Sequence, residues 1–255
     1  MNLLELQGVH THIGRYHILH GVDLAVPEGQ VTMLLGRNGA GKTTTLRTIM
    51  GLWPVSQGAI TFNGQPLQGR RTPDIAQMGI GYVPESMGIF GDLTVQENMV
   101  LAARSARRAD ELDTQRLEWI FGFFPALKKF WLYPAGKLSG GQKQMLAVAR
   151  AIVEPRRLLL IDEPSKGLAP SIVHNLVQAL RELKAQRCTV LLVEQNFQMA
   201  KALGDTVAVM DNGRVMHRGA MAALADDEEL QQRWLGLSLG VSLGLSAGLS
   251  PEVHP

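Results

Sequence analysis

The segment at residues 36–43, which reads Gly-Arg-Asn-Gly-Ala-Gly-Lys-Thr, limits the fold of this chain more than any other feature. Its three glycines allow consecutive backbone N–H groups to turn inward around a phosphate, which β-carbons at those positions would obstruct. An apolar run precedes the segment at 31–35, and a helix-forming stretch follows it at 42–50. This order of strand, loop and helix predicts a phosphate-binding loop within an α/β fold.

The side chains of the loop and of a second apolar run predict a nucleotide site with Mg²⁺. Lys42 is expected to bridge the β- and γ-phosphates, and the hydroxyl of Thr43 is expected to bind Mg²⁺. The run 158–161 ends in Asp162, whose carboxylate would complete the metal shell, and the next residue, Glu163, is the candidate general base. The loop residues expected to bind the nucleotide are Gly36, Arg37, Asn38, Gly39, Ala40, Gly41, Lys42, Thr43 and Thr44.

Composition favours a soluble globular protein with one large core. Hydrophobic residues make up 45% and charged residues 19% of the 255 residues, and the formal net charge of +2 is too small to indicate nucleic-acid binding. The sequence contains no uninterrupted apolar stretch of the roughly 20 residues that a membrane span needs. The segment 1–5 lacks the basic start of a signal peptide. We therefore expect a cytoplasmic location.

Cysteine and histidine give no sign of further chemistry. Cys188 is the single cysteine, which excludes an internal disulfide, and its position in the apolar run 188–193 predicts a buried strand residue rather than a nucleophile. Among seven histidines, only His10 and His12 are close in sequence, without a neighbouring cysteine or carboxylate cluster. We expect ordinary surface or strand positions for them.

The pattern along the chain predicts a nucleotide-binding core with a mainly parallel sheet, an antiparallel β flank and an inserted α-helical subdomain. The core would span 1–235, with the helical subdomain at about 86–150 and a closing hairpin turn at 211–213. The expected strands are 3–9, 21–26, 31–35, 59–62, 80–83, 158–161, 188–193 and 206–210. The expected helices are 94–104, 110–121, one from the end of 138–142 to 152, 171–184 and 197–203.

The end of the chain has a different composition. Residues 235–250 form four successive tetrapeptides, Leu-Gly-Leu-Ser, Leu-Gly-Val-Ser, Leu-Gly-Leu-Ser and Ala-Gly-Leu-Ser. The period of two suits a strand added to a partner or to the edge of the domain, but the glycines make ordering entropically costly. A flexible tail at 236–255 is therefore favoured over such a strand, which stays open as a second interpretation.

A second motif narrows the class of nucleotide-binding protein. A phosphate-binding loop alone could belong to a kinase, a GTPase or a helicase, but Leu-Ser-Gly-Gly-Gln at 138–142 lies upstream of Leu-Leu-Leu-Ile-Asp-Glu at 158–163. From Leu3 to about Leu224 the chain resembles the ATP-binding cassette family. The resemblance implies ATP hydrolysis, and it implies that Ser139, Gly140, Gly141 and Gln142 bind the γ-phosphate held by a second subunit. One loop and one signature per chain then imply a head-to-tail pair, with the segment 165–168 along the shared interface.

Without the phosphate-binding loop, the signature would indicate only a helix that begins after an N-cap serine.

Three other classes of protein are alternatives to the ATPase of an importer. A non-transport cassette protein that acts on chromosomes or ribosomes usually has either long coiled coils between the two motifs or two cassettes in one chain. The segment between the two motifs of this chain is too short for long coiled coils or for a second cassette. A small-molecule kinase would leave 138–142 unexplained. The ATPase of an exporter stays open.

Two departures from the common cassette pattern point to one branch of the family. Glu85, in Val-Pro-Glu at 83–85, stands where most members have glutamine, and Gln195 stands where most have a switch histidine. Together with 162–170, these residues resemble the ATPases of importers for branched-chain amino acids, urea and short amides. The resemblance implies Glu85 near the metal, Gln195 near the γ-phosphate, membrane permease subunits as partners, and a solute-binding protein as an indirect partner. The chain would then lie at the cytoplasmic face of the cell membrane.

The residue that stacks on adenine departs from the family pattern as well. Family members often place an aromatic residue about two dozen positions before the phosphate-binding loop, but Ile13 occupies that place. Tyr16 lies nearby and is the candidate for stacking.

Overall fold

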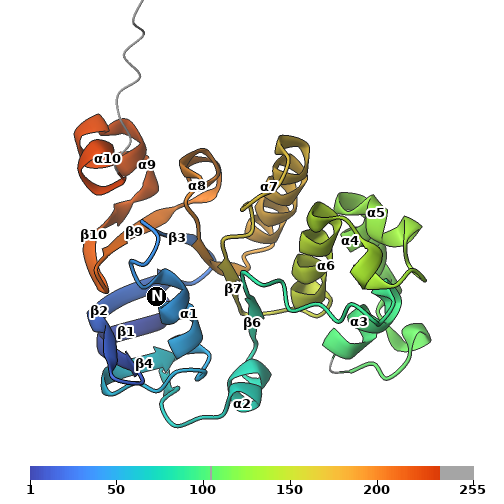
Figure 1. Ribbon diagram of the computed structural model, residues 1–255, viewed down its shortest axis with the longest axis horizontal. Helices are drawn as coiled ribbons and strands as arrows, with labels where there is room; N and C mark the ends of the chain where they lie inside the picture. The colour runs from blue at the N-terminus through green and yellow to red at the C-terminus, as the bar shows by residue number, and fades with distance from the viewer. Residues whose placement is uncertain (104, 236–255) are drawn as a thin grey trace, which may run out of the picture.

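The computed structural model describes residues 1–103 and 105–235, so the repeat expected to form a tail at 236–255 lies outside the described residues. One of its two sheets has four antiparallel strands in the order β2-β1-β4-β5 (Figure 1). This sheet is the expected antiparallel flank. Its strands are β1 (Asn2–Ile13), β2 (Tyr16–Pro27), β4 (Gln57–Phe62) and β5 (Gln65–Pro66).

The second sheet has six strands in the order β10-β9-β3-β8-β7-β6. Five of them are parallel, and β10 pairs antiparallel with β9 across the turn at 211–213, which confirms the expected hairpin and the mainly parallel sheet. Its strands are β3 (Val31–Gly36), β6 (Ile80–Val83), β7 (Leu158–Asp162), β8 (Thr189–Val193), β9 (Thr206–Asp211) and β10 (Arg214–Ala220).

Alternate side chains of the parallel strands enter two different cores. Leu158 and Leu160 pack in one cluster with the antiparallel sheet and with α1 (Lys42–Ile49). Leu159 and Ile161 pack in the other cluster, with helices on the opposite face of the sheet. Both faces are therefore covered, which explains why these strands read as continuous apolar runs. Burial of each such leucine contributes about 1.5 to 3 kcal/mol.

The helical subdomain begins after β6, at the right of Figure 1. Thr94 caps α3 with a capping box, so the helix starts one residue later than expected. Asp113 caps α4 by accepting from the N–H of Arg116, which moves the start of the helix expected at 110–121 to Thr114. The elements of this region are α3 (Val95–Ala102), η1 (Ala109–Glu111), α4 (Thr114–Phe123), α5 (Pro125–Lys129), η2 (Ala135–Lys137) and α6 (Gly140–Ile152).

The remaining helices connect the strands or close the core. The expected helices at 171–184 and 197–203 are present as α7 (Pro170–Ala185) and α8 (Phe197–Leu203). The short helices α2 (Thr72–Gln77), α9 (Met221–Asp226) and α10 (Glu228–Leu235) were not predicted, and neither was α5 in the helical subdomain.

Cys188 was expected inside a strand, but β8 begins one residue later and the Cys188 side chain is half-buried. Burial raises the pKa of its thiol to about 11. Because the thiolate is the reactive form, Cys188 is a poor nucleophile at neutral pH, as expected.

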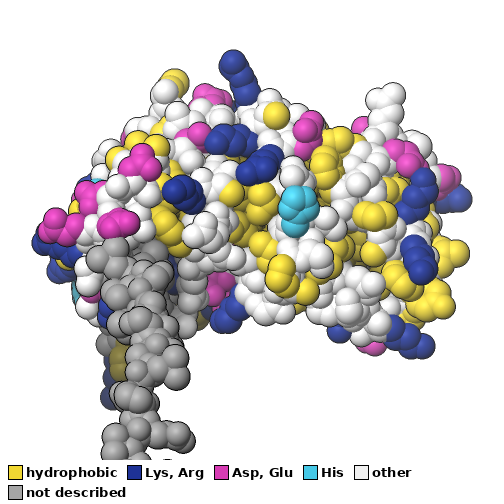
Figure 2. Space-filling view, turned by 90° about the horizontal axis from the view of Figure 1, so that it is seen from above, with side chains coloured by type: hydrophobic (Ala, Val, Ile, Leu, Met, Phe, Trp, Pro, Cys, Tyr) yellow, Lys and Arg dark blue, Asp and Glu magenta, His cyan; other side chains and the backbone are white. Residues whose placement is uncertain are grey.

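The surface carries mixed charge where it can be seen. On the face shown in Figure 2, Lys and Arg side chains lie among acidic and apolar ones rather than in one basic stripe. Within residues 1–103 and 105–235, no helix is long and apolar enough to cross a membrane.

Candidate active site

The phosphate-binding loop connects the carboxyl end of β3 to the start of α1. Gly41 caps α1 with a φ of 105°, a left-handed conformation that favours glycine. A β-carbon on Gly36, whose φ is 148°, would collide with the carbonyl oxygen of Met210 on β9. The backbone and the neighbouring strand therefore require these two glycines. The N-terminus of α1 points toward the loop, where its dipole favours an anion.

Lys42 lies inside the loop and is 4% exposed. Its Nζ donates to the carbonyl oxygens of Gly36 at 2.8 Å and Arg37 at 3.1 Å. The same atom lies 3.3 Å from Oε1 of Glu163, which is 8% exposed. A buried ammonium thus faces both the loop and a carboxylate.

Thr43 and Asp162 join the loop to the end of β7. The hydroxyl of Thr43 donates to Oδ1 of Asp162 at 3.1 Å. The other oxygen, Oδ2, is buried without a hydrogen-bond partner among the described residues. Burial raises the pKa of Asp162 to about 6, against the bond from Thr43 and with the added repulsion of the carboxylates of Glu163 and Glu85. An unpartnered carboxylate oxygen beside a hydroxyl is an oxygen-donor set suited to a hard divalent cation.

Glu163 is held in an unusual backbone conformation. Its φ is 46°, and its N–H donates to the carbonyl oxygen of Val193 at 2.9 Å. Left-handed backbone at a residue other than glycine is strained and clusters at functional sites. Gln195, which follows β8, donates from Nε2 to both carboxylate oxygens of Glu163 at 2.7 Å and to Oδ1 of Asn38 at 2.7 Å. One amide therefore joins the carboxylate to the phosphate-binding loop.

The structure adds Lys166, which sequence reasoning did not select. Its Nζ lies 2.6 Å from Oε1 of Glu85 and 3.7 Å from Oε2 of Glu163. The hydrogen bond that it donates to Glu85 raises the pKa of Lys166. The signals in the sequence were its place in the segment 165–168, expected along the shared interface, and a basic residue three positions after Glu163.

Lys42, Thr43, Glu85, Glu163 and Lys166 line one cavity of about 350 Å³, and Gln195 lines a neighbouring cavity that shares Asn38. Tyr16 does not line the first of these cavities and is 70% exposed at the start of β2, whereas Ile18, two residues further along the strand, does line it. Stacking of adenine on Tyr16 therefore stays a prediction. The full lining of the first cavity is Ile18, Asn38, Gly39, Ala40, Gly41, Lys42, Thr43, Thr44, Glu85, Glu163 and Lys166.

The signature residues lie at the start of α6. Ser139 caps the helix by accepting from the N–H of Gln142 at 3.3 Å, and Oε1 of Gln142 accepts from the N–H of Ser139 at 2.9 Å. Gly140 and Gly141 form the first turn, and Ser139 is exposed. In Figure 1, α6 lies with the helical subdomain, apart from α1. The structure therefore does not bring the signature of this chain to its own phosphate-binding loop.

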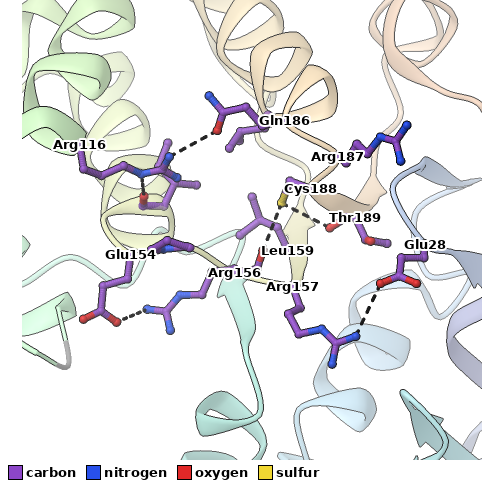
Figure 3. Close-up of a pocket in the computed structure, with 13 residues that line it drawn as sticks. Glu28, Arg116, Glu154, Arg156, Arg157, Leu159, Gln186, Arg187, Cys188 and Thr189 are labelled. Carbon is purple, nitrogen blue, oxygen red and sulfur yellow. Dashed lines mark hydrogen bonds and ion pairs between the residues drawn. The ribbon is translucent and has the colours of Figure 1, made fainter.

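Another cavity, of about 340 Å³, lies at the amino ends of β7 and β8 (Figure 3). Its arginines point in different directions: Arg157 pairs with Glu28 at 3.6 Å, and Arg116 donates to the carbonyl oxygen of Ile152 at 2.8 Å. It adjoins neither the phosphate-binding loop nor the strand ends that carry Asp162 and Gln195. The first cavity is therefore the candidate site.

The histidines are closer together than their spacing suggested. His10 and His12 on β1 lie beside His17 and His20 on β2, with ring centroids 4.1 Å apart for His12 and His17 and 4.0 Å apart for His17 and His20. Partial burial, His17 and Arg214 lower the pKa of His20. Across residues 1–103 and 105–235, no group of three or more His, Cys, Asp or Glu side chains is arranged to hold a metal ion.

The parallel sheet, the loop ahead of α1, and the carboxylates at the ends of β6 and β7 define a P-loop nucleotide hydrolase. Comparison with known proteins identifies the family within this class. The family model described as ABC transporter matches residues 19–166. The chain belongs to this family and is an ATPase.

Two relatives and one solved structure show where in the family the similarity lies. The high-affinity branched-chain amino acid transport ATP-binding protein BraG of Pseudomonas aeruginosa is 36% identical over 92% of this chain and 100% of the relative. A probable branched-chain amino acid transport ATP-binding protein, LivF of Archaeoglobus fulgidus, is 34% identical over 87% of this chain and 93% of the relative. A bacterial ABC transporter cassette solved as a dimer has a TM-score of 0.77 at 24% identity, covering 86% of this chain and 98% of its own, which shows the shared fold.

Proposed function

We propose that this chain is the ATP-hydrolysing subunit of an importer for branched-chain amino acids or related small polar solutes. The main supporting observation is the convergence of Lys42, Asp162, Glu163 and Gln195 beside the phosphate-binding loop. The two relatives named for branched-chain amino acid transport support the class of cargo. The presence of Glu85 together with Gln195, which the resemblance assigned to the same branch, agrees with them.

Each side chain has a role that its geometry suits. Lys42 would exchange its bonds to the carbonyl oxygens of Gly36 and Arg37 for the phosphates of ATP. Glu163 would accept a proton from the attacking water as the general base. Gln195 would orient that water, because its amide already contacts both oxygens of Glu163.

The residues present fit Mg²⁺. Oδ2 of Asp162 has no partner among the described residues, the Thr43 hydroxyl is 3.1 Å from the other oxygen, and Glu85 lines the same cavity as Thr43. When bound, Mg²⁺ neutralises charge that develops on the transferred phosphoryl group. Thr43, Asp162 and Glu85 would hold it there.

The signature supports pairing of two cassettes head to tail. Ser139, Gly140, Gly141 and Gln142 form a helix N-terminus that is exposed at its first two residues, which suits an anion, and this end of α6 is separate from the chain's own phosphate-binding loop. We propose that they bind the γ-phosphate of ATP held by the other subunit. That subunit is either a second copy of this chain or a related cassette, and the mass of the ATP-bound pair distinguishes the two.

The segment 85–94 is proposed to transmit closure of the pair to a membrane permease. It starts at Glu85 in the site and ends at the cap of α3. Arg150 of α6 donates to the carbonyl oxygen of Gly88, and its guanidinium lies 5.1 Å from the ring centroid of Phe90. We propose a peripheral position at the cytoplasmic face of the membrane, with the ATPase domain at 1–235, its helical subdomain at about 86–150, and a solute-binding protein acting indirectly.

The test uses Glu163→Gln, which keeps the shape of the side chain and removes the base. We expect this variant to bind ATP without hydrolysing it and to accumulate as a pair, seen as an ATP-dependent increase in mass by light scattering, alone or with its co-purifying subunits. Cells carrying it in place of the parent chain should lose uptake of radiolabelled leucine. Glu182→Gln, an exposed change on α7, is the matched control and should retain both activities.

Two outcomes would contradict this function. If Glu163→Gln hydrolyses ATP at the parent rate, Glu163 is not the base. If leucine, isoleucine and valine uptake all persist while ATP hydrolysis is lost, the cargo is of another class.

A further inference from the structure

The ammonium of Lys166 lies between two carboxylates of the candidate site. Its Nζ is 2.6 Å from Oε1 of Glu85 and 3.7 Å from Oε2 of Glu163. The other oxygen of Glu163 is 3.3 Å from Nζ of Lys42. Two lysines, one at the start of α1 and one after β7, therefore neutralise this acidic side of the cavity in the nucleotide-free chain.

The contact joins two segments that leave neighbouring strands. Glu85 follows β6, and Lys166 follows β7, which pairs in parallel with β6. The carboxyl ends of parallel strands meet at one edge of the sheet, so the pair is a direct result of the topology. Lys166 is 57% exposed, and an exposed ion pair adds little to folding stability. Its effect should be sought in the charge and position of Glu85.

Glu85 is also one of the three residues proposed to hold the divalent cation: it lines the same cavity as Thr43, and its charge acts on Asp162. A carboxylate oxygen that accepts from an ammonium at 2.6 Å is less available to a second cation, and the two cations repel one another. We propose that Lys166 is a positioning residue that competes with the divalent cation for the carboxylate of Glu85. This inference rests on the proposed function.

The competition has a consequence for the segment 85–94. While Lys166 holds Glu85, the start of that segment is fixed to the loop after β7. Binding of a divalent cation by Glu85 would replace this ion pair, so the first residue of the connection to the helical subdomain would be held by the metal site instead of by the loop after β7. Metal binding and the position of the segment are therefore coupled through one carboxylate.

The experiment measures Mg²⁺ binding without turnover. The purified full chain is mixed with saturating ATP and EDTA, MgCl₂ is then titrated, and thermal stabilisation is followed. Lys166→Gln should reach half of its Mg²⁺-dependent stabilisation at about three- to tenfold lower free Mg²⁺ than the parent chain. Lys166→Arg keeps the charge and should stay within about twofold. Lys201→Gln, an exposed change on α8, is the matched control and should match the parent.

A double variant tests whether the effect passes through Glu85. In a Glu85→Gln background, Lys166→Gln should shift the Mg²⁺ midpoint by less than about twofold, because the competed carboxylate is gone. A shift of full size in that background would show a general charge effect and would overturn the inference.

The outcomes separate this inference from the function on which it rests. ATP alone should stabilise the parent chain in EDTA. If it does, and Lys166→Gln titrates with Mg²⁺ like the parent, only the role of Lys166 is wrong. If ATP stabilises the parent under no condition, the proposed function and this inference fail together.

Discussion

Replacement of Asp162 by asparagine should stabilise the nucleotide-free chain while it abolishes hydrolysis. The carboxylate of Asp162 is fully buried, and its Oδ2 has no partner among the described residues. Its pKa rises from 3.8 to about 6, mainly by burial. At neutral pH the folded chain therefore carries an ionised group that its surroundings disfavour.

The magnitude follows from that shift. A rise from 3.8 to about 6 corresponds to about 3 kcal/mol against the ionised form. Part of this is lost to screening, because Asp162 bonds to Thr43, which lines the open nucleotide cavity. Asparagine keeps the oxygen that accepts from Thr43, but it buries an N–H₂ group without a partner, which costs about 1 kcal/mol. We expect a net gain of about 1 to 2 kcal/mol in the free energy of unfolding.

The assay is chemical and thermal denaturation in EDTA without nucleotide, followed by circular dichroism at pH 7.5. A gain of this size should raise Tm by about 3 to 6 °C for a chain of this length. Asp110→Asn, at an exposed position paired with Arg108, is the control and should change stability by less than about 0.5 kcal/mol. A total loss of about 2 kcal/mol or more in Asp162→Asn would refute the reasoning, because the buried amide accounts for only roughly 1 kcal/mol of it. Such a loss would show that the carboxylate stabilises the empty site.

Two further predictions concern Gln195 and His20. Gln195→Ala should lower ATP turnover in the assembled transporter by about one to two orders of magnitude, because Glu163 loses its amide contact. Gln195→His should stay active, with a pH dependence between about 6 and 7.5. A rate for Gln195→Ala equal to that of the parent would show that Gln195 has no part in hydrolysis. The pKa of His20 is lower in the folded chain than in the unfolded chain. The folded chain therefore loses stability as the pH falls below the pKa that His20 has in the unfolded chain. Denaturation at pH 7.5 and 5.5 should show a smaller loss for His20→Asn than for the parent, and equal losses would contradict this.

The phosphate-binding loop could be predicted from the sequence because its chemistry is local. The positive φ of Gly36 and Gly41 belongs to the loop itself, and the buried strands β3 and β7 read as apolar runs. Thr43 and Asp162 could be predicted to lie together, because Thr43 comes after one apolar strand and Asp162 ends another. In the structure, the Thr43 hydroxyl donates to Oδ1 of Asp162 at 3.1 Å. Parallel strands put their carboxyl ends at one edge, so the motif order already implied this contact.

The limits of short helices were harder to predict because capping competes with periodicity. Residues 110–121 carry a helical pattern, but Asp113 accepts from the N–H of Arg116 and fixes the start of α4 at Thr114. The histidine cluster was missed for another reason. His17 and His20 become neighbours of His10 and His12 only through the register of a hairpin with several bulges, which spacing along the chain does not reveal.

The sequence motifs do not predict the contact between Lys166 and Glu85. A cassette motif leaves the position of Lys166 open, so its side chain has no expected role, and Glu85 stands 81 residues away. Once β6 and β7 pair in parallel, both positions fall on one edge, and opposite charges there attract across a short gap. We therefore propose that a residue that the motif leaves unspecified, Lys166, sets how strongly the carboxylate of Glu85 binds a cation.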